Sequence, residues 1–332
     1  MRKNLSGMAA AILIGLLAAG PVKAADYVMK FGIATMNEAQ HNFTKMYKEA
    51  LEKASAGRIE VQIYPNSQLG PIPREIESTQ FGTIQAYMGP VDFFVGIDPR
   101  FGVFSAPMLF RDEIHAAATI HDPSLEVAVL DLAEAKNLMG MAMLSVGASN
   151  YAARVPLMTI ADFKGKKLRI NGSELERQKM SRLGATGVAL PLSEVMPALS
   201  QGVIDGTISA TSIFVAFKMI DLVKTVTVTN DTMLVTLAVV SKLWLDKLPP
   251  DLRKLVIDTG LATQGPAQAW EQDFSKRQEA EWNAMGGTIH KISPADQAQL
   301  KTMLATVGDD ATRSQPPVHE MLEKVRATAA KF

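Results

Sequence analysis

The segment from Ile160 to Thr211 constrains the fold of this chain more than any other stretch. Lys167–Ile170 is expected to form a short strand that turns into a helix. Ser173 and Glu176 have the spacing of a capping box, in which each side chain satisfies an unpaired backbone N–H at the helix start. Gly184 is expected to end the helix, because glycine adopts the left-handed terminal conformation at little cost.

The same segment then repeats the pattern. Gly187–Leu190 is predicted to be a second strand, Ser193 to cap a second helix, and Thr207–Ser209 to form a third strand. Strands that alternate with helices indicate a parallel sheet, whose ligands gather at the carboxyl ends of the strands. Arg169 lies near such an end, and its planar guanidinium can bind a carboxylate through two parallel hydrogen bonds. From its position alone, an exposed side chain with a weak surface partner is favoured over a binding role for Arg169, because such pairs are common.

The first 24 residues have the pattern of a secretory signal. Arg2 and Lys3 supply the positive start, Gly7 to Gly20 the short apolar core, and Val22 to Ala24 a small-residue cleavage site. The apolar run is shorter than the roughly 20 residues of a membrane-spanning helix. We therefore expect export to the periplasm with cleavage after Ala24. The chain has no cysteine, which excludes disulfides and thiolate chemistry.

Length and charge narrow the class of protein further. A chain of 332 residues that is 47% hydrophobic can build large cores and suggests two domains. The predicted signal carries three basic residues and no acid, so the remainder has 31 basic and 34 acidic side chains. A nearly neutral chain without a basic run argues against nucleic acid and anionic membranes as main partners.

Helices and strands are expected to alternate along the whole chain, which predicts an α/β fold. The other expected strands are Tyr27–Ile33, Ile59–Tyr64, Gly82–Met88, Met139–Val146, strands within Val226–Val240, and Thr288–Ile292. The first helix is expected to follow a loop at Asn37–Phe43 and to end near Ser55. The other expected helices are Pro73–Phe81, His115–Ile120, Leu125–Lys136, Phe214–Val223, Pro249–Gly260, Pro266 to about Met285, a helix that starts at Ser293-Pro294, and Val318–Ala330 after a break at Pro316-Pro317. The absence of a flexible linker favours two lobes joined by crossing strands and able to close about a hinge.

A set of short motifs in a fixed order gives the chain a family resemblance. They are Gly57–Ile59, Tyr64–Gly70, Gln80–Thr83, Pro107–Phe110, Asp162–Arg169, Pro191–Val195, Gly202–Gly206, and Trp244 with Leu248-Pro249. Each motif is weak, but the ordered set spans nearly the whole chain after the signal. The chain resembles the solute-binding proteins of tripartite ATP-independent periplasmic (TRAP) transporters, the dicarboxylate-binding DctP-like family.

The resemblance implies a fold, a function and partners. It implies a two-lobed periplasmic-binding-protein-like fold in which a small organic acid binds in the cleft and is delivered to the membrane permease subunits. Arg169 matches the arginine of the family's Lys-x-Arg motif, which forms a salt bridge with the ligand carboxylate. We expect lobe I at 25–146 plus about 236–270, lobe II at 147–235 plus about 271–305, and a C-terminal helix at 306–332 packed on the lobes. The protein is expected to be a monomer.

Departures from the family pattern shape the expected ligand. Ser209 replaces an asparagine that helps to hold the ligand in many relatives, Ser149 replaces an arginine, and Asp231 a frequent histidine. Fewer polar groups suggest a monocarboxylate with an apolar or aromatic body. Aromatic residues near the expected pocket are Tyr87, Phe93, Phe94, Tyr151, Phe214 and Phe217, about half of which are expected to be core instead. The candidate ligand-binding residues are Arg169, Ser209, Thr211, Phe214, Asn230, Asp231, Tyr151, Arg154, Tyr87, Gly89 and His41.

No catalytic or metal signature accompanies these residues. The five histidines show no metal-ligand spacing, and no zinc, nucleophile-elbow, phosphate-loop or dinucleotide motif occurs in its required context. We therefore expect no catalytic residue, metal or cofactor. Two other function classes stay open: an exported hydrolase or lyase that uses Asp and His in the same cleft, and a module that senses the ligand and reports to a membrane receptor.

Overall fold

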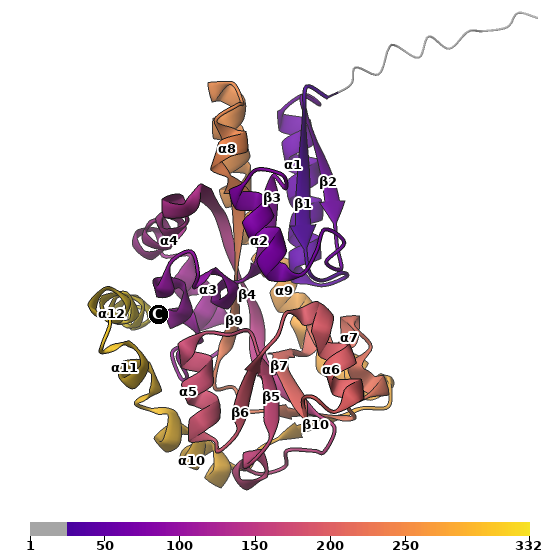
Figure 1. Ribbon diagram of the computed structural model, residues 1–332, viewed down its shortest axis with the longest axis vertical. Coiled ribbons are helices and arrows are strands. Elements are labelled where there is room, and N and C mark those ends of the chain that lie inside the picture. The colour runs from indigo at the N-terminus through magenta and orange to yellow at the C-terminus, as the bar shows by residue number, and fades with distance from the viewer. Residues whose placement is uncertain (1–24) are drawn as a thin grey trace, which may run out of the picture.

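The computed structural model describes residues 25–332, so the predicted signal and its cleavage site lie outside the described part of the chain. Within these residues a ten-stranded sheet is flanked by helices, and its main path runs in the order β2-β1-β3-β9-β4-β7-β5-β6. Figure 1 shows β1, β2 and β3 in the upper part of the molecule and β5, β6 and β7 in the lower part, with β4 and β9 between them. The predicted α/β class is confirmed.

One group of strands is parallel and begins at the first described residues. β1 (Tyr27–Ile33) pairs with β2 (Ile59–Tyr64) on one side and β3 (Ala86–Pro90) on the other. The connecting helices are α1 (Ala39–Ala54) and α2 (Ile72–Gln80). Aromatic side chains of β1 and α1 pack against each other in the core of this group.

The second parallel group is the segment that dominates the sequence. β5 (Lys167–Ile170) lies between β6 (Thr186–Ala189) and β7 (Gly206–Ala210), parallel to both. The connecting helices are α5 (Glu174–Arg182) and α6 (Val195–Gln201). Both hydrogen bonds of the α5 capping box are present. Gly184, which follows the last turn of α5, has a φ of +71°, as predicted for a glycine that ends a helix.

Two antiparallel strands connect the groups. β4 (Leu138–Ala153) pairs with β9 (Met233–Ser241) along one half and with β7 along the other. A bulge interrupts β4 between Ser145 and Ala148, where Gly147 has a φ of +85° that favours glycine. The predicted end of this strand at Val146 is wrong.

The longest helix also passes from one group to the other. α9 (Pro250–Ala284) is continuous for 35 residues, so the predicted division into two helices is wrong. Pro266 lies within it on the exposed face, while Ala267 and Gln268 beside it are buried. The buried neighbours pack on β4, and this packing outweighs the local loss of one backbone hydrogen bond at proline.

The C-terminal helices lie along one side of the molecule (Figure 1). α10 (Pro294–Leu304), α11 (Val307–Thr312) and α12 (Pro316–Ala329) follow one another, and the two prolines open α12 instead of preceding it. α11 contacts α5, whereas α12 contacts α3 and α4. The remaining regular elements are α3 (Glu113–Ile120), α4 (Pro123–Leu130), α7 (Thr211–Ala216), β8 (Thr225–Val228), α8 (Lys242–Leu245) and β10 (Thr288–Lys291), together with 3₁₀ turns at Val91–Phe94, Pro99–Ser105, Asp131–Lys136, Ile160–Phe163, Leu192–Glu194 and Met219–Asp221.

Further boundaries differ from those predicted. The strand expected at Gly82–Met88 is β3, which starts four residues later, and the helix expected at Leu125–Lys136 ends at Leu130 and continues as a 3₁₀ turn. The expected loop at Asn37–Phe43 is mostly helical, because Glu38 caps α1 and accepts hydrogen bonds from two backbone amides of its first turn. Ser193 does not cap α6, since it lies inside a 3₁₀ turn. The helix expected at Phe214–Val223 is the short α7 followed by a separate 3₁₀ turn.

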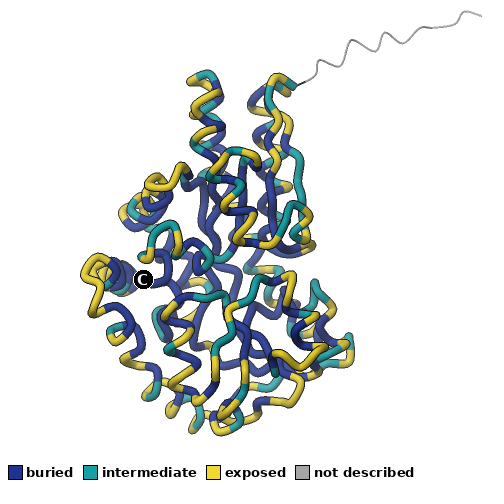
Figure 2. Tube along the Cα trace, in the orientation of Figure 1, coloured by how far each residue is buried: buried dark blue, intermediate teal, exposed yellow. Residues whose placement is uncertain are grey.

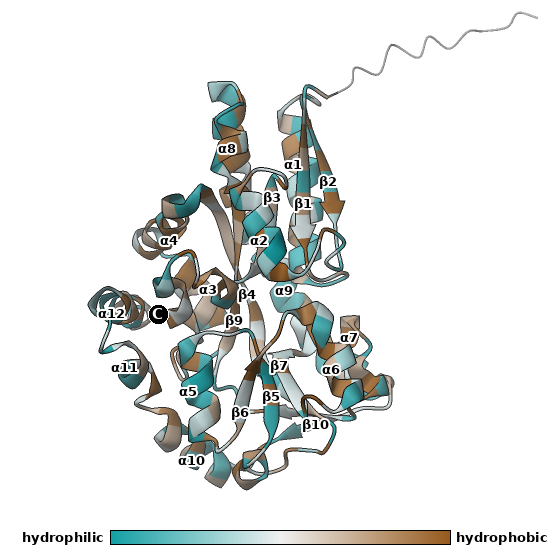
Figure 3. Cartoon of the chain, viewed as in Figure 1, coloured by the Kyte–Doolittle hydropathy of each residue, from teal (hydrophilic) through white to brown (hydrophobic). Residues whose placement is uncertain are grey.

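The core follows the sheet. Figure 2 shows the central strands as buried and the outer helix faces as exposed, and Figure 3 shows that β4 and β9 are largely hydrophobic. No helix within residues 25–332 is both long and apolar enough to cross a membrane.

Candidate functional site

Arg169 is buried between the two groups of strands. Its side chain extends from β5, the residue is 2% exposed, and Nε donates to the Leu190 carbonyl oxygen at 2.8 Å. The Phe93 ring centroid lies 5.9 Å from the guanidinium carbon, within the range of a cation–π contact. Burial lowers the pKa of Arg169 to about 10, so this side chain is still charged at neutral pH.

Two buried carboxylates lie in the neighbourhood of Arg169, but neither forms an ion pair with it. Glu176 accepts from the Gly172 amide at 2.7 Å at the start of α5. Asp92 accepts from the Ser105 hydroxyl at 2.5 Å, and burial followed by the charge of Glu176 raises the pKa of Asp92 to about 7. Within residues 25–332 no carboxylate oxygen lies within 4.0 Å of the Arg169 guanidinium. The arrangement leaves its charge available to an anionic ligand.

Arg169 lines a cavity of about 20 Å³ that receives residues from both groups of strands. We call it the cleft cavity. Its walls combine aliphatic and polar side chains: Ala34, Ile72, Pro90, Leu192, Ile213 and Leu234 with Thr35, Gln40, Asn171, Ser209 and Arg169. This volume holds about one water molecule, so an organic acid needs the walls to move apart.

The start of α1 places an unpaired acceptor beside this cavity. Gln40 Nε2 donates to the Thr35 hydroxyl at 3.3 Å, while Gln40 Oε1 is buried without a hydrogen-bond partner. Glu38, which caps α1, accepts from the Gln40 and His41 amides at 3.1 Å each. Burial raises the pKa of Glu38 despite these hydrogen bonds. Gln40 can therefore accept a hydrogen bond from a donor group in the cavity.

Residues 32–315 match the model of the family described as bacterial extracellular solute-binding protein, family 7. The chain belongs to this family. The C4-dicarboxylate-binding periplasmic protein DctP of Rhodobacter capsulatus is 29% identical over 320 residues, which cover 93% of each chain. The 2,3-diketo-L-gulonate-binding periplasmic protein YiaO of Escherichia coli is 27% identical over 252 residues, or 75% of this chain and 76% of that protein.

Solved structures show the same fold. A TRAP periplasmic solute-binding protein from Sulfurospirillum deleyianum with bound succinate has a TM-score of 0.85 and 23% identity, over 92% of this chain and 99% of that one. A second, from Haemophilus influenzae with bound L-gulonate, has a TM-score of 0.85 and 21% identity, over 91% and 99%. The predicted family and the two-lobed fold are confirmed.

In this solute-binding protein, Ser209 is the one other predicted residue that lines the cleft cavity with Arg169. His41 is close by on α1, where its Nδ1 accepts from the Asn37 amide at 3.0 Å. Burial and Lys45 lower the pKa of His41. Tyr87 and Gly89 lie on β3, whose last residue, Pro90, lines the cleft cavity. Thus the cleft cavity brings only Ser209 of the predicted set together with Arg169 among the described residues, and the other predicted residues lie outside its lining.

Asp231 and Tyr151 belong to a buried ion-pair network under α5. Lys179 is fully buried, and its Nζ lies 3.1 Å from Asp231 Oδ2 and donates to the Thr232 hydroxyl at 2.9 Å. The Tyr151 hydroxyl donates to the same Asp231 oxygen at 3.3 Å, and Thr229 donates to the other oxygen at 2.6 Å. Both predicted residues are therefore occupied by partners within the protein.

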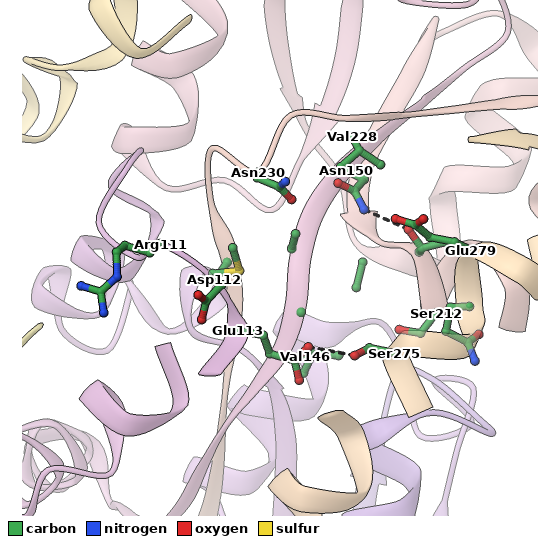
Figure 4. Close-up of a pocket in the computed structure, with 16 residues that line it drawn as sticks. Arg111, Asp112, Glu113, Val146, Asn150, Ser212, Val228, Asn230, Ser275 and Glu279 are labelled. Carbon is green, nitrogen blue, oxygen red and sulfur yellow. Dashed lines mark hydrogen bonds between the residues drawn. The ribbon is translucent and has the colours of Figure 1, made fainter. Parts of the chain in front are cut away.

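The other predicted residues lie in the core, on the surface or at a second cavity. Phe214 packs on Trp282 with ring centroids 6.4 Å apart. Arg154 is exposed, beside Asp205. Thr211 and Asn230 line a cavity of about 240 Å³ that we call the hinge cavity, since the bulge of β4 forms one wall (Figure 4).

Sequence reasoning missed Thr35, Gln40 and Asn171 in the cleft cavity. Asn171 follows directly after the predicted strand that carries Arg169, so its position at a strand end was a usable signal. Thr35 and Gln40 also follow a strand, β1. Gln40 was missed because a loop was expected where α1 begins, and the start of α1 orients this side chain.

A group of three possible metal ligands occurs far from Arg169 in the described chain. Oxygen or nitrogen atoms of Asp309, His319 and Glu323 lie within 4.8 Å of one another. Arg326 Nη1 already donates to Asp309 at 2.6 Å and to Glu323 at 2.7 Å. A guanidinium therefore supplies the positive charge at this place.

Proposed function

We propose that this protein captures a small organic acid at Arg169 and delivers it to a TRAP membrane permease. The observation that carries the proposal is the buried, charged Arg169 without a carboxylate within 4.0 Å among residues 25–332. A ligand carboxylate there would form the charge-assisted, two-pronged hydrogen bonds that suit a guanidinium. The names of the two curated relatives and the succinate and L-gulonate of the two solved structures support an acidic ligand.

The lining of the cleft cavity supports an aliphatic ligand. Six of its side chains are aliphatic, and the aromatic Tyr87, Tyr151 and Phe214 are fully buried in packed cores. Gln40 Oε1 needs a donor, because a buried acceptor without a partner costs about 1–3 kcal/mol. We therefore propose a short aliphatic monocarboxylate that carries a hydroxyl group, and retain the apolar part of the ligand expected from the sequence.

The proposal includes binding without turnover, action in the periplasm after signal cleavage, and a monomeric state. The buried face of α12 packs on α3 and α4 of the same chain, which supports a monomer. We propose the lobe boundaries expected from the sequence, 25–146 with about 236–270 and 147–235 with about 271–305, with 306–332 on the lobes. Continuity of α9 across both lobes means that closure bends this helix or changes its contacts.

A thermal-shift experiment tests the binding site. A short 2-hydroxy acid at 100 times its Kd should stabilise the mature protein by about 2.7 kcal/mol, because it binds only the folded state. Arg169→Ala should abolish the shift, whereas Arg154→Ala, which removes an exposed arginine, should preserve it. Gln40→Leu should weaken 2-hydroxybutyrate binding about tenfold and leave butyrate binding unchanged.

Each result separates the parts of the proposal. A full shift with Arg169→Ala would contradict carboxylate capture at this residue. Tight succinate or phenylacetate binding with none of 2-hydroxybutyrate would contradict the ligand class alone. Conversion of the acid to a product, followed by NMR, would contradict binding without turnover.

A further inference from the structure

The hinge cavity has an excess of hydrogen-bond acceptors. It is lined by the start of α3, the bulged part of β4, the start of α7 and the last turns of α9 (Figure 4). Four oxygen atoms in its lining residues are buried without a partner: Glu113 Oε1, Asn150 Oδ1, Ser212 Oγ and Gln278 Oε1. Buried polar atoms of native proteins are almost always satisfied by protein, water or an ion, so this concentration calls for a ligand.

The orientation of these groups is fixed by their other atoms. Gln278 Nε2 donates to the Phe274 carbonyl oxygen at 3.2 Å, which directs Oε1 away from that carbonyl. Ser275 donates to Glu113 Oε2 at 2.8 Å, a contact drawn as a dashed line in Figure 4. Asn150, Ser212 and Gln278 are 6%, 3% and 2% exposed, so bulk water does not readily replace a bound partner.

The basic side chains near the cavity have other partners. Arg111 Nη2 donates to the Phe332 carbonyl oxygen at 2.9 Å. Lys276 pairs with Asp273 at 2.9 Å, and Lys291 with Glu279 at 3.2 Å. None of these three residues forms an ion pair with Glu113, and burial raises the pKa of Glu113 although the Ser275 hydrogen bond and the charge of Lys276 oppose this effect.

A second buried carboxylate lies on α9, next to the residues of this helix that line the hinge cavity. Glu271 is one turn before Ser275 on α9, is fully buried, and has two oxygen atoms without partners. Burial raises the pKa of Glu271 to about 9, and the charges of Glu113 and Glu38 add to the effect. A positive charge beside Glu113 would lower the free energy of the ionised form of Glu271 as well.

We propose that the hinge cavity is a binding site for a hard divalent cation, with Ca²⁺ the best match. Carboxylate, amide and hydroxyl oxygens are the groups that Ca²⁺ takes as ligands, in flexible geometry and together with water. The carboxylates of Asp112 and Glu113, which both line the cavity, balance two positive charges, which a monovalent ion does not supply. A volume of about 240 Å³ leaves room for several water ligands at about 30 Å³ each.

Bound Ca²⁺ would hold α3, β4, α7 and α9 together at the β4 bulge. Ser209 and Ile213 line the cleft cavity, and Thr211 and Ser212 between them line the hinge cavity. The two sites thus share one short segment at the β7–α7 junction. Because they share it, cation and organic acid should influence each other's affinity, and by the same factor in both directions.

Calcium titration of the chelator-treated mature protein tests the site. Isothermal calorimetry should give one Ca²⁺ per chain, and bound Tb³⁺ should luminesce on excitation of Trp282, which is one turn after Gln278 on α9. Glu113→Gln should weaken binding at least tenfold, and Gln278→Glu should strengthen it. Glu323→Gln, which alters the other group of possible ligands, should have no effect. Circular dichroism melting of each variant checks folding.

Other outcomes overturn the proposal. Absence of saturable Ca²⁺ binding would show that water alone satisfies these oxygens. Unchanged binding in Glu113→Gln, or loss of binding in Glu323→Gln, would place the ion elsewhere. Saturation by Na⁺ at equal concentration would exclude the divalent assignment. Because the titration contains no organic acid, none of these results depends on the function proposed for Arg169.

Discussion

Lys179 shows how much a single buried residue can determine. Its ammonium group is enclosed by Asp231, Thr232 and the ring of Tyr151, whose centroid is 5.5 Å away. Two buried charges are stable in such a place only as a pair, since each alone bears the full cost of removal from water.

We predict that Lys179→Met lowers the free energy of unfolding by about 3–5 kcal/mol, because it leaves Asp231 buried and unpaired. The double variant Lys179→Met with Asp231→Asn should recover much of this loss. Lys276→Met, which removes an exposed lysine from α9, should change stability by less than about 0.5 kcal/mol. Urea unfolding measures all three, and a loss below about 1 kcal/mol for Lys179→Met would contradict the pairing argument.

At this scale the sequence predicted residues whose role is local. The spacing of Ser173 and Glu176 predicts the capping box, which is confirmed, whereas the ligand role of Arg169 follows from its place near a strand end together with the family motif and stays a prediction. Asp231 could not be assigned, because its partner Lys179 is 52 residues away and nothing local distinguishes a buried lysine from an exposed one. Distant pairs depend on the tertiary fold, which local patterns do not contain.

Among the elements, α9 and β4 are joined by side-chain hydrogen bonds. Gln264 Oε1 accepts from the Met143 amide at 3.1 Å. Gln268 accepts from the Ser145 amide at 2.9 Å and donates to the Ser145 carbonyl at 3.0 Å. These glutamines satisfy the backbone of β4 where a neighbouring strand does not, just before its bulge.

We predict that Gln268→Met destabilises the protein by about 2–3 kcal/mol, because two buried backbone groups of Ser145 lose their partner. The exposed Gln299 on α10 provides the control, and Gln299→Met should be nearly neutral. Thermal unfolding measures the difference. Equal melting temperatures for the two variants would mean that water replaces the glutamine at β4.

The same contacts explain which elements the sequence misjudged. Strands with simple alternation, such as β1 and β2, were predicted with correct ends. β4 continues past the predicted end through Ser149 and Asn150, which are buried. Their burial is tolerated because the Ser149 amide donates to the Thr232 carbonyl at 2.8 Å and the Asn150 side-chain amide donates to the Thr211 hydroxyl at 2.9 Å. Buried polar residues that are satisfied by distant parts of the chain resemble loop residues in a sequence.

The whole molecule carries several buried acids whose protonation affects its stability. Burial raises the pKa of Glu75 to about 7 from 4.5, and of Asp92 to about 7 from 3.8. It raises the pKa of Glu271 to about 9 from 4.5. These three acids therefore bind more protons in the folded protein than in the unfolded chain between about pH 4 and pH 9, and their contribution to stability falls as the pH rises through this range.

We predict that Glu271→Gln, measured in chelator, makes the protein more stable at pH 9 than the unaltered protein, by on the order of 1–3 kcal/mol. At pH 4, where this acid is largely protonated in both states, the two proteins should differ little. Denaturant unfolding at both pH values measures this. Equal stabilities at pH 9 would show that Glu271 is ionised at no cost. Glu279→Gln, at a partly exposed acid on the same helix, is the matched control.

The pairing of β3 with β9 joins residues 86–90 to residues 236–240. During synthesis the first three strands would emerge with β3 as an open edge, and about 150 residues must follow before that edge is covered. Neither half can complete its sheet while the ribosome is still making the other. We therefore predict that folding of this chain is a late event, and that fragments ending before Ser241 fail to fold and are degraded or aggregate.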